Sequence, residues 1–309
     1  MLSRRHIRLK VMQSLYAYFS NKEDEVLKAE RSMLKHFEEV VELKLVIIGL
    51  LVELVKYADN FYKEGKKKYL PTDLDLHPNR RFIDNPVVNQ IFSNDKLMNR
   101  VNKFSAIWLQ NDLDIIRKLF VDLHSSDLYQ KYTVSTNESV ELDKKFIIDA
   151  LNDCILKNEL VHHVLEERSI YWIDDLPFIA TIIFGNIKDD ISLDTSEVFK
   201  DISDKDFALE LFRNIIINND EYENIIVRFA INWDLDRIAI MDQLLLKMAF
   251  SEILSMSELP VKVSMNEYIE IAKYYSTSKS RLFINGLLDN FVKTYSKEGK
   301  IRKVGRGLI

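Results

Sequence analysis

Glycine, proline and cysteine are all scarce in this chain. Its 309 residues include 7 glycines, 5 prolines and 1 cysteine. Folds rich in β-strands need glycine and proline at many turns, so this scarcity excludes most all-β architectures and predicts an all-α protein. The single cysteine, Cys154, excludes an intramolecular disulfide and is typical of a reducing compartment, where it serves as a small core residue.

Long uninterrupted apolar runs are also missing. The segment 40–55 is apolar, but Glu42, Lys44 and Glu53 interrupt it, and it is shorter than the ~20 residues of a membrane-spanning helix. The basic N-terminus is not followed by an apolar run and a cleavage site, so we expect neither a signal peptide nor a membrane partner. The sequence therefore predicts a cytoplasmic protein.

Signatures of enzymes and metal sites are weak. The chain has no glycine-rich phosphate loop and no nucleotide-binding motif. Glu159 and His162 lie on one helical face, as in carboxylate-bridged metal bundles, but such sites need a second pair of this kind, which the sequence lacks. We therefore expect a protein without catalytic residues, metal or cofactor.

Positive charge gathers at both ends of an otherwise acidic chain. The formal net charge of −5 argues against nonspecific coating of nucleic acid. Yet four cations lie within the first ten residues, before the first acid, Glu23, and six cations against one acid, Glu298, lie from Lys293 onward. If the fold brings the two ends together, a local basic patch can bind an acidic polymer.

Apolar residues recur at helical spacing along most of the chain. The C-terminal region 232–293 predicts three amphipathic helices over 235–254, 266–275 and 281–295. Pro260 ends the first, Ser264 or Asn266 caps the second, and Ser278 or Ser280 caps the third. Further helices are expected over 3–19, 23–62, 85–108, 112–124, 140–167, 174–184 and 221–231, and after Ser203–Asp204, with a proline-containing connection over 66–86.

The C-terminal region contains three sequence motifs: DQLLLKMAFSEIL from Asp242, PVKVSMNEYIEIAK from Pro260 and FINGLLD from Phe283. Together they resemble the NusB family of bacterial transcription antitermination factors, as does the arginine-rich N-terminal helix with its Gln-x-Leu-Tyr word from Gln13. The resemblance implies an all-α, NusB-like bundle of two small helical subdomains. Residues 21–197 contain no motif of the family. We therefore expect a discontinuous NusB-like RNA-binding domain, 1–20 and 198–296, which is enlarged by a helical insertion, 21–197. A basic tail, 297–309, would follow this domain.

The N-terminal helix is the first candidate for an RNA contact. Arg4 and Arg8 lie on the same stripe as the apolar residues of this helix, and arginines beside free first-turn N–H groups suit a phosphate. The residues alone leave frayed, solvated charges as an equal alternative. The resemblance favours contact with RNA and implies these RNA-binding residues: Arg4, Arg5, Arg8, Gln13, Tyr16, Lys279, Ser280 and Phe283.

Two of those residues keep an alternative. Tyr16 either stacks on a base or is buried in a helix seam, and Phe283 either stacks on an unpaired base or belongs to the core. The resemblance also places Asp236, Arg237 and Asp242 where the family meets its protein partner, the ribosomal protein NusE. Of these three, Asp242 is the strongest candidate for an acid that faces a basic protein.

The resemblance implies an RNA-binding transcription antitermination factor. It would act on boxA-like elements of single-stranded ribosomal RNA leaders, together with NusE and the RNA polymerase elongation complex. One alternative is a helical protein-interaction scaffold that has lost RNA binding. Another is an RNA-binding module associated with a ribosomal RNA methyltransferase, which the missing cofactor motif disfavours. The sequence leaves open the oligomeric state and the role of the insertion, whose cations at 66–68 and 80–81 are one candidate extension of the RNA site.

Overall fold

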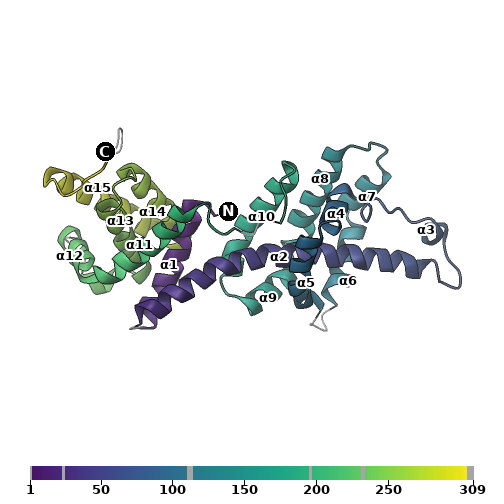
Figure 1. Ribbon diagram of the computed structural model, residues 1–309, viewed down its shortest axis with the longest axis horizontal. Coiled ribbons are helices and arrows are strands. Elements are labelled where there is room, and N and C mark those ends of the chain that lie inside the picture. The colour runs from purple at the N-terminus through teal and green to yellow at the C-terminus, as the bar shows by residue number, and fades with distance from the viewer. Residues whose placement is uncertain (1, 23–24, 110–113, 195–196, 231–233, 305–309) are drawn as a thin grey trace. The chain divides into compact units, whose positions relative to one another are not determined.

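The computed structural model describes residues 2–22, 25–109, 114–194, 197–230 and 234–304. Within those ranges every regular element is helical, from α1 to α15, with one π-helical segment and one 3-10 turn (Figure 1). This confirms the all-α prediction. The chain divides into two compact units, which we call unit 1, Met1–Phe37 with Glu197–Ile309, and unit 2, Glu38–Ser196.

Unit 1 is built around one buried helix. Its elements are α1 (Arg4–Ser20), the start of α2 (Val26–Gly65), α11 (Ile202–Ile217), α12 (Asn219–Phe229), η2 (Leu235–Arg237), α13 (Ile240–Ser255), α14 (Val261–Tyr275) and α15 (Ser278–Lys297). Helix α13 packs against α1, α11, α12, α14 and α15. Most of its residues are buried, as expected for a helix that is apolar on nearly every side.

Helices α13 and α14 run antiparallel. Near the end of α13, Glu252 accepts a hydrogen bond from Ser264 in the first turns of α14. At the start of α13, Asp242 accepts one from Ser276, which directly follows α14. The ten residues between Glu252 and Asp242 span about 15 Å of helix. We call the Glu252 side the arginine end and the Asp242 side the pocket end.

The chain leaves unit 1 and returns to it at neighbouring positions. The rings of Phe37 and Phe199 lie 4.9 Å apart between centroids. The first turns of α2 also pack in unit 1, where Arg213 donates two hydrogen bonds to Glu30 at 2.6 and 2.7 Å. The compact unit therefore extends to Phe37, beyond residue 20, where the sequence placed the start of the insertion. The functional division into domains stays a prediction.

Unit 2 packs shorter helices along the remainder of α2 (Figure 1). They are α3 (Asp73–Leu76), α4 (Pro86–Phe92), α5 (Asp95–Leu109), α6 (Ile115–Ser125), α7 (Asp127–Val134), α8 (Val140–Asp149), η1 (Ala150–Ile155), α9 (Glu159–Arg168) and α10 (Trp172–Lys188). Aromatic contacts hold this layer together: the Tyr62 and Tyr129 hydroxyls lie 2.8 Å apart, and Tyr132 stacks on Phe146 at 3.8 Å. Within the described residues no single helix is long and apolar enough to cross a membrane, and only α9 and α10 together, bent by 115°, pass that test.

Several predicted helix limits are wrong. The helix expected over 85–108 breaks between α4 and α5, where Asn94 accepts from the Leu97 N–H, and the one expected over 140–167 breaks before α9, which Asn158 caps. Helix α14 starts directly after Pro260, because Ser264 is buried and bonded to Glu252 instead of serving as a cap. Thr277 caps α15. The start of the helix expected over 112–124 lies outside the described residues.

Candidate nucleic-acid interface

Arg8 is locked inside unit 1. Its guanidinium is 2% exposed and donates from Nε and Nη2 to the Glu252 carboxylate at 2.8 and 2.6 Å. Glu252 is fully enclosed and also accepts from Ser264 Oγ at 2.6 Å and from the Tyr268 hydroxyl at 2.9 Å. Four donors thus satisfy the buried charge and join α1 to α13 and α14. The ion pair removes the Arg8 side chain from the surface, so this arrangement does not support the expected contact of Arg8 with RNA.

Arg4 and Arg5 reach the surface, but each already has an acidic partner. Arg5 donates from Nε and Nη2 to Glu267 on α14 at 2.7 and 2.8 Å. Arg4 donates from Nε to Asp204 on α11 at 2.9 Å and lies 5.0 Å above the Phe207 ring. The hydrogen bond from Arg5 lowers the pKa of Glu267, so this acid stays ionised at neutral pH. The arginine end is therefore largely neutralised within unit 1.

Two further groups lie at the arginine end, one neutral and one cationic. Burial, together with the charges of Arg5 and Lys10, lowers the pKa of His6 to about 4, so its imidazole is neutral at pH 7. Lys303 donates to the carbonyls of Glu252 and Met256 at 3.3 and 2.7 Å, which satisfies the end of α13. Arg8 and Lys303, which lie near opposite ends of the sequence, therefore both contact Glu252.

Two exposed cations complete the arginine end. Lys262 lies in the first turn of α14, two residues before Ser264, and Arg302 lies next to Lys303. Neither forms an ion pair with another residue in the described part of the chain. Their charges are therefore available to an anionic ligand.

A pocket of about 250 Å³ lies at the opposite end of α13. Its lining residues are Arg237, Ile238, Ala239, Asp242, Lys279, Ser280 and Phe283. It therefore combines side chains expected to bind RNA with side chains expected to bind the protein partner. Phe283 is half-buried, and Lys279 is exposed. A space of this size is smaller than a drug-sized pocket and suits a single planar base.

The three residues expected to bind the protein partner differ in how exposed their side chains are. Asp242 is only 4% exposed and accepts a hydrogen bond from Ser276, so the structure does not support its expected role as an outward-facing interface acid. Its carboxylate instead stabilises the junction of α13 and α14. Asp236 and Arg237 are exposed, and Arg237 lies 3.6 Å from Asp234, a weak surface pair.

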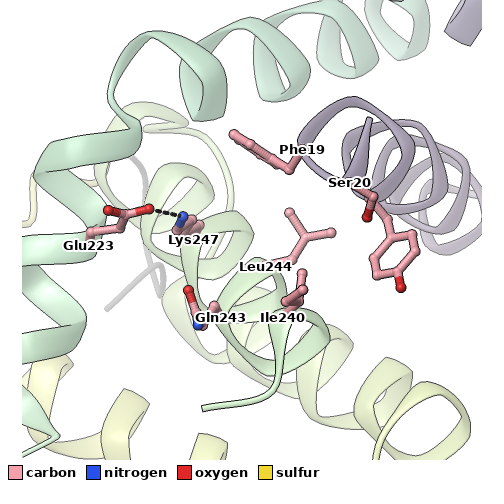
Figure 2. Close-up of a pocket in the computed structure, with 8 residues that line it drawn as sticks. Phe19, Ser20, Glu223, Ile240, Gln243, Leu244 and Lys247 are labelled. Carbon is pink, nitrogen blue, oxygen red and sulfur yellow. Dashed lines mark hydrogen bonds and ion pairs between the residues drawn. The ribbon is translucent and has the colours of Figure 1, made fainter. Parts of the chain in front are cut away.

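A second groove, of about 200 Å³, lies between α1, α12 and α13 (Figure 2). Lys247 projects into it and donates to Glu223 and to Asn219, both at 2.7 Å, with its ammonium 5.2 Å from the centre of the Phe19 ring. Tyr16 and Ile240 also line the groove and are 42% and 57% exposed. Tyr16 is therefore not buried in a seam, and Gln13, one turn earlier, is half-buried.

Sequence reasoning missed the acids and one aromatic residue. Three acids, Asp204, Glu252 and Glu267, pair with arginines that are more than 190 residues away in the chain. No local sequence pattern indicates such pairs. Tyr274 is 83% exposed and follows Glu267 by seven residues, so it lies on the same stripe of α14. That spacing was visible in the sequence, but the exposure of the stripe was not.

Neither metal nor nucleophile chemistry finds support in the described residues. No group of three or more His, Cys, Asp or Glu side chains among them has the arrangement to hold a metal ion. His162 lies 2.6 Å from the Leu156 carbonyl, a local contact at the start of α9. Burial raises the pKa of the Cys154 thiol, which keeps it protonated.

Known proteins are similar in sequence to the C-terminal part of this chain. The model of the NusB family matches residues 181–293. The transcription antitermination protein NusB of Salinibacter ruber is 46% identical over 110 residues, which are 36% of this chain and 69% of that protein. This chain belongs to the NusB family. The NusB proteins of Chloroherpeton thalassium and Clostridium kluyveri are 42% and 34% identical, over 37% and 40% of this chain and 54% and 85% of those proteins.

The family match covers only part of this NusB-family chain. A solved structure of T. maritima NusB is 31% identical over 38% of this chain and 80% of its own, with a TM-score of 0.31. Residues 181–293 include α11 to α14 and most of α15, and hence the pocket end. Helix α1 and most of unit 2 lie outside the segment that the NusB family model matches.

Proposed function

We propose that this protein is a non-enzymatic RNA-binding factor in transcription antitermination. It would act on boxA-like elements of ribosomal RNA leaders with the ribosomal protein NusE and the RNA polymerase elongation complex. Its similarity to NusB transcription antitermination proteins supports the general role. The observation that carries the RNA contact is that unit 1 has exposed cations at the Glu252 end of α13 and a base-sized pocket, lined largely by the start of α15, at the Asp242 end.

The two ends suggest how a strand would lie. Arg4, Arg5, Lys262 and Arg302 would contact phosphates, because arginine and lysine supply the electrostatic part of RNA affinity. Phe283 would stack on an unpaired base in the pocket, with Lys279 and Ser280 at its rim. Since the ends lie about 15 Å apart, the ligand must be a strand of several nucleotides, and it would pass the exposed Tyr274.

The protein partner would dock at the start of α13. Asp236 and Arg237 are exposed and lie just before this helix. Ile240, the first residue of the helix, lines the groove shown in Figure 2. An exposed aromatic and aliphatic pair, Tyr16 and Ile240, beside the charged pair of Lys247 and Glu223, is typical of a protein–protein contact.

One observation favours the scaffold alternative. Arg4, Arg5 and Arg8 are all paired with acids inside unit 1, and a helix whose arginines are already paired is less suited to binding phosphate. The antitermination proposal requires that the protein binds RNA, whereas the scaffold alternative requires that it does not.

Fluorescence anisotropy of a labelled boxA-type RNA and of its shuffled version, with and without NusE and at two salt concentrations, tests the proposal. We expect binding that prefers the boxA-type RNA, tightens with NusE and weakens with salt. Arg5→Gln with Lys262→Gln should weaken binding about tenfold and reduce the salt slope by ~1.4, since each phosphate contact on a single strand contributes ~0.7.

The matched control is Lys131→Gln, which removes an 81% exposed cation from unit 2 and should leave RNA affinity unchanged. Flat titrations with both RNAs would reject the antitermination proposal and leave the scaffold alternative.

A further inference from the structure

The pairing of Arg5 with Glu267 bears on how this protein would discriminate between RNAs, an inference that depends on the proposed RNA binding. Glu267 occupies Nε and Nη2 of Arg5, which form the bidentate edge that also suits a phosphate. A phosphate that approaches Arg5 must either displace this carboxylate or bind beside its negative charge. In both cases Glu267 opposes the phosphate.

We propose that Glu267 is an internal competitor for the Arg5 guanidinium that suppresses binding to RNAs lacking the recognised bases. Binding of the right bases at the pocket end would hold the strand in one register, with a phosphate positioned at Arg5, so that this RNA displaces Glu267 more readily than an RNA without that register. An RNA without the right bases gains only phosphate contacts, which the competitor weakens. Glu267 therefore raises specificity at the expense of affinity.

Of the three acids at the arginine end, Glu267 has the geometry of a displaceable partner. Its side chain is 18% exposed, against 8% for Asp204 and 0% for Glu252, and Arg5, at 49%, is the most exposed of the three arginines paired with these acids. Glu252 has four donors and cannot leave Arg8 without stranding a buried charge. Displacement is thus confined to the Arg5–Glu267 pair.

Glu270 supplies a matched control on the same helix. It lies one turn after Glu267 and pairs with Lys273, not with an arginine of α1. Glu270→Gln removes the same charge from the same region but leaves the bonds between Arg5 and Glu267 in place. Any general electrostatic effect of losing a carboxylate should therefore show equally in this variant.

The test measures binding of labelled boxA-type RNA and its shuffled version to the full chain, to Glu267→Gln and to Glu270→Gln, across a salt series. With Glu267→Gln we expect shuffled RNA to bind about three- to tenfold more tightly and the salt slope to steepen by ~0.7, the effect of one further phosphate contact. Affinity for the boxA-type RNA should rise less, so the preference between the two RNAs narrows. Glu270→Gln should change neither the affinity nor the slope.

Adding Arg5→Gln to Glu267→Gln completes the design. The gain for shuffled RNA should disappear in the double variant, because it depends on the released guanidinium. No gain with Glu267→Gln, an equal gain with Glu270→Gln, or a gain that persists without Arg5 would each overturn the competitor proposal. The proposed function fails by a separate measurement, the absence of any preference for boxA-type RNA in the unmodified protein.

Discussion

Arg8 and Glu252 form the most deeply buried charge pair of unit 1 among the described residues. Removing two charges from water is costly, and the cost is met here by four hydrogen bonds to one carboxylate. The same burial, next to the charge of Glu252, raises the pKa of Tyr268 well above its ordinary value, so its hydroxyl remains a donor. This network fixes the orientation of α1 on α13 and α14, and with it the positions of Arg4 and Arg5.

Arg8→Met should destabilise the protein by about 3–5 kcal/mol, because it leaves the Glu252 charge buried without its cationic partner. Arg4→Met should cost about 0–1 kcal/mol, since Arg4 is 38% exposed and solvent screens its pair with Asp204. Urea unfolding followed by circular dichroism measures both free energies. Equal losses in the two variants would contradict the assignment of Arg8 as a structural charge.

At the scale of the element, α15 positions the side chains at the pocket end that are proposed to contact RNA. Thr277 caps the helix by accepting from the Ser280 N–H at 3.1 Å, so the helix begins at Ser278. One turn later Phe283 faces the pocket, while its neighbour Leu282 is 68% exposed. Adjacent positions on one helix thus supply a candidate stacking residue and a solvent-facing one.

Phe283→Ala should weaken binding of boxA-type RNA by roughly 5- to 150-fold, the equivalent of the ~1–3 kcal/mol that stacking of one base contributes. Phe283→Trp should retain most of the affinity, because it keeps an aromatic face. Leu282→Ala removes an apolar side chain from the adjacent position and should change affinity little. Anisotropy titrations measure all three, and unchanged binding by Phe283→Ala would remove the pocket from the proposed RNA site.

At the scale of the whole molecule, unit 2 is inserted at one point of unit 1. Phe37 and Phe199 are in ring contact, so the chain departs and returns at the same place. The cations of the insertion that were candidates for RNA contact are largely used locally. Lys67 pairs with Glu64, Lys68 with Asp75, and Arg81 donates to the carbonyls of three residues in the 132–137 segment. Apart from the exposed Lys66, the candidate cations of the insertion therefore offer little free charge to an RNA strand.

Replacing residues 38–196 by a short glycine–serine linker should leave a folded, helical protein, because the two ends to be joined are already adjacent. Its affinity for boxA-type RNA should stay within about threefold of the full chain, since the proposed phosphate contacts all lie in unit 1. Circular dichroism and anisotropy check these two expectations. A folded variant with much weaker binding would show that unit 2 contributes to the RNA site.

Helix content, the family resemblance and the existence of a cationic N-terminal helix were all determined by the sequence itself. The scarcity of glycine and proline, the helical spacing of apolar residues and short motifs such as FINGLLD are all properties of the sequence. They can therefore be recognised without a structure. The break before α9 was missed because a capping asparagine inside a periodic pattern is a weak local signal.

Only the tertiary structure decided which charges are free. Arg4, Arg5 and Arg8 look alike in sequence, yet one is buried and two are exposed, and each faces an acid from a distant helix. Asp242 looked like a surface acid and is enclosed, whereas Tyr274 looked unremarkable and is exposed. The reason is physical: burial and ion pairing depend on what packs against a side chain, and those neighbours come from segments that helical periodicity does not relate to one another.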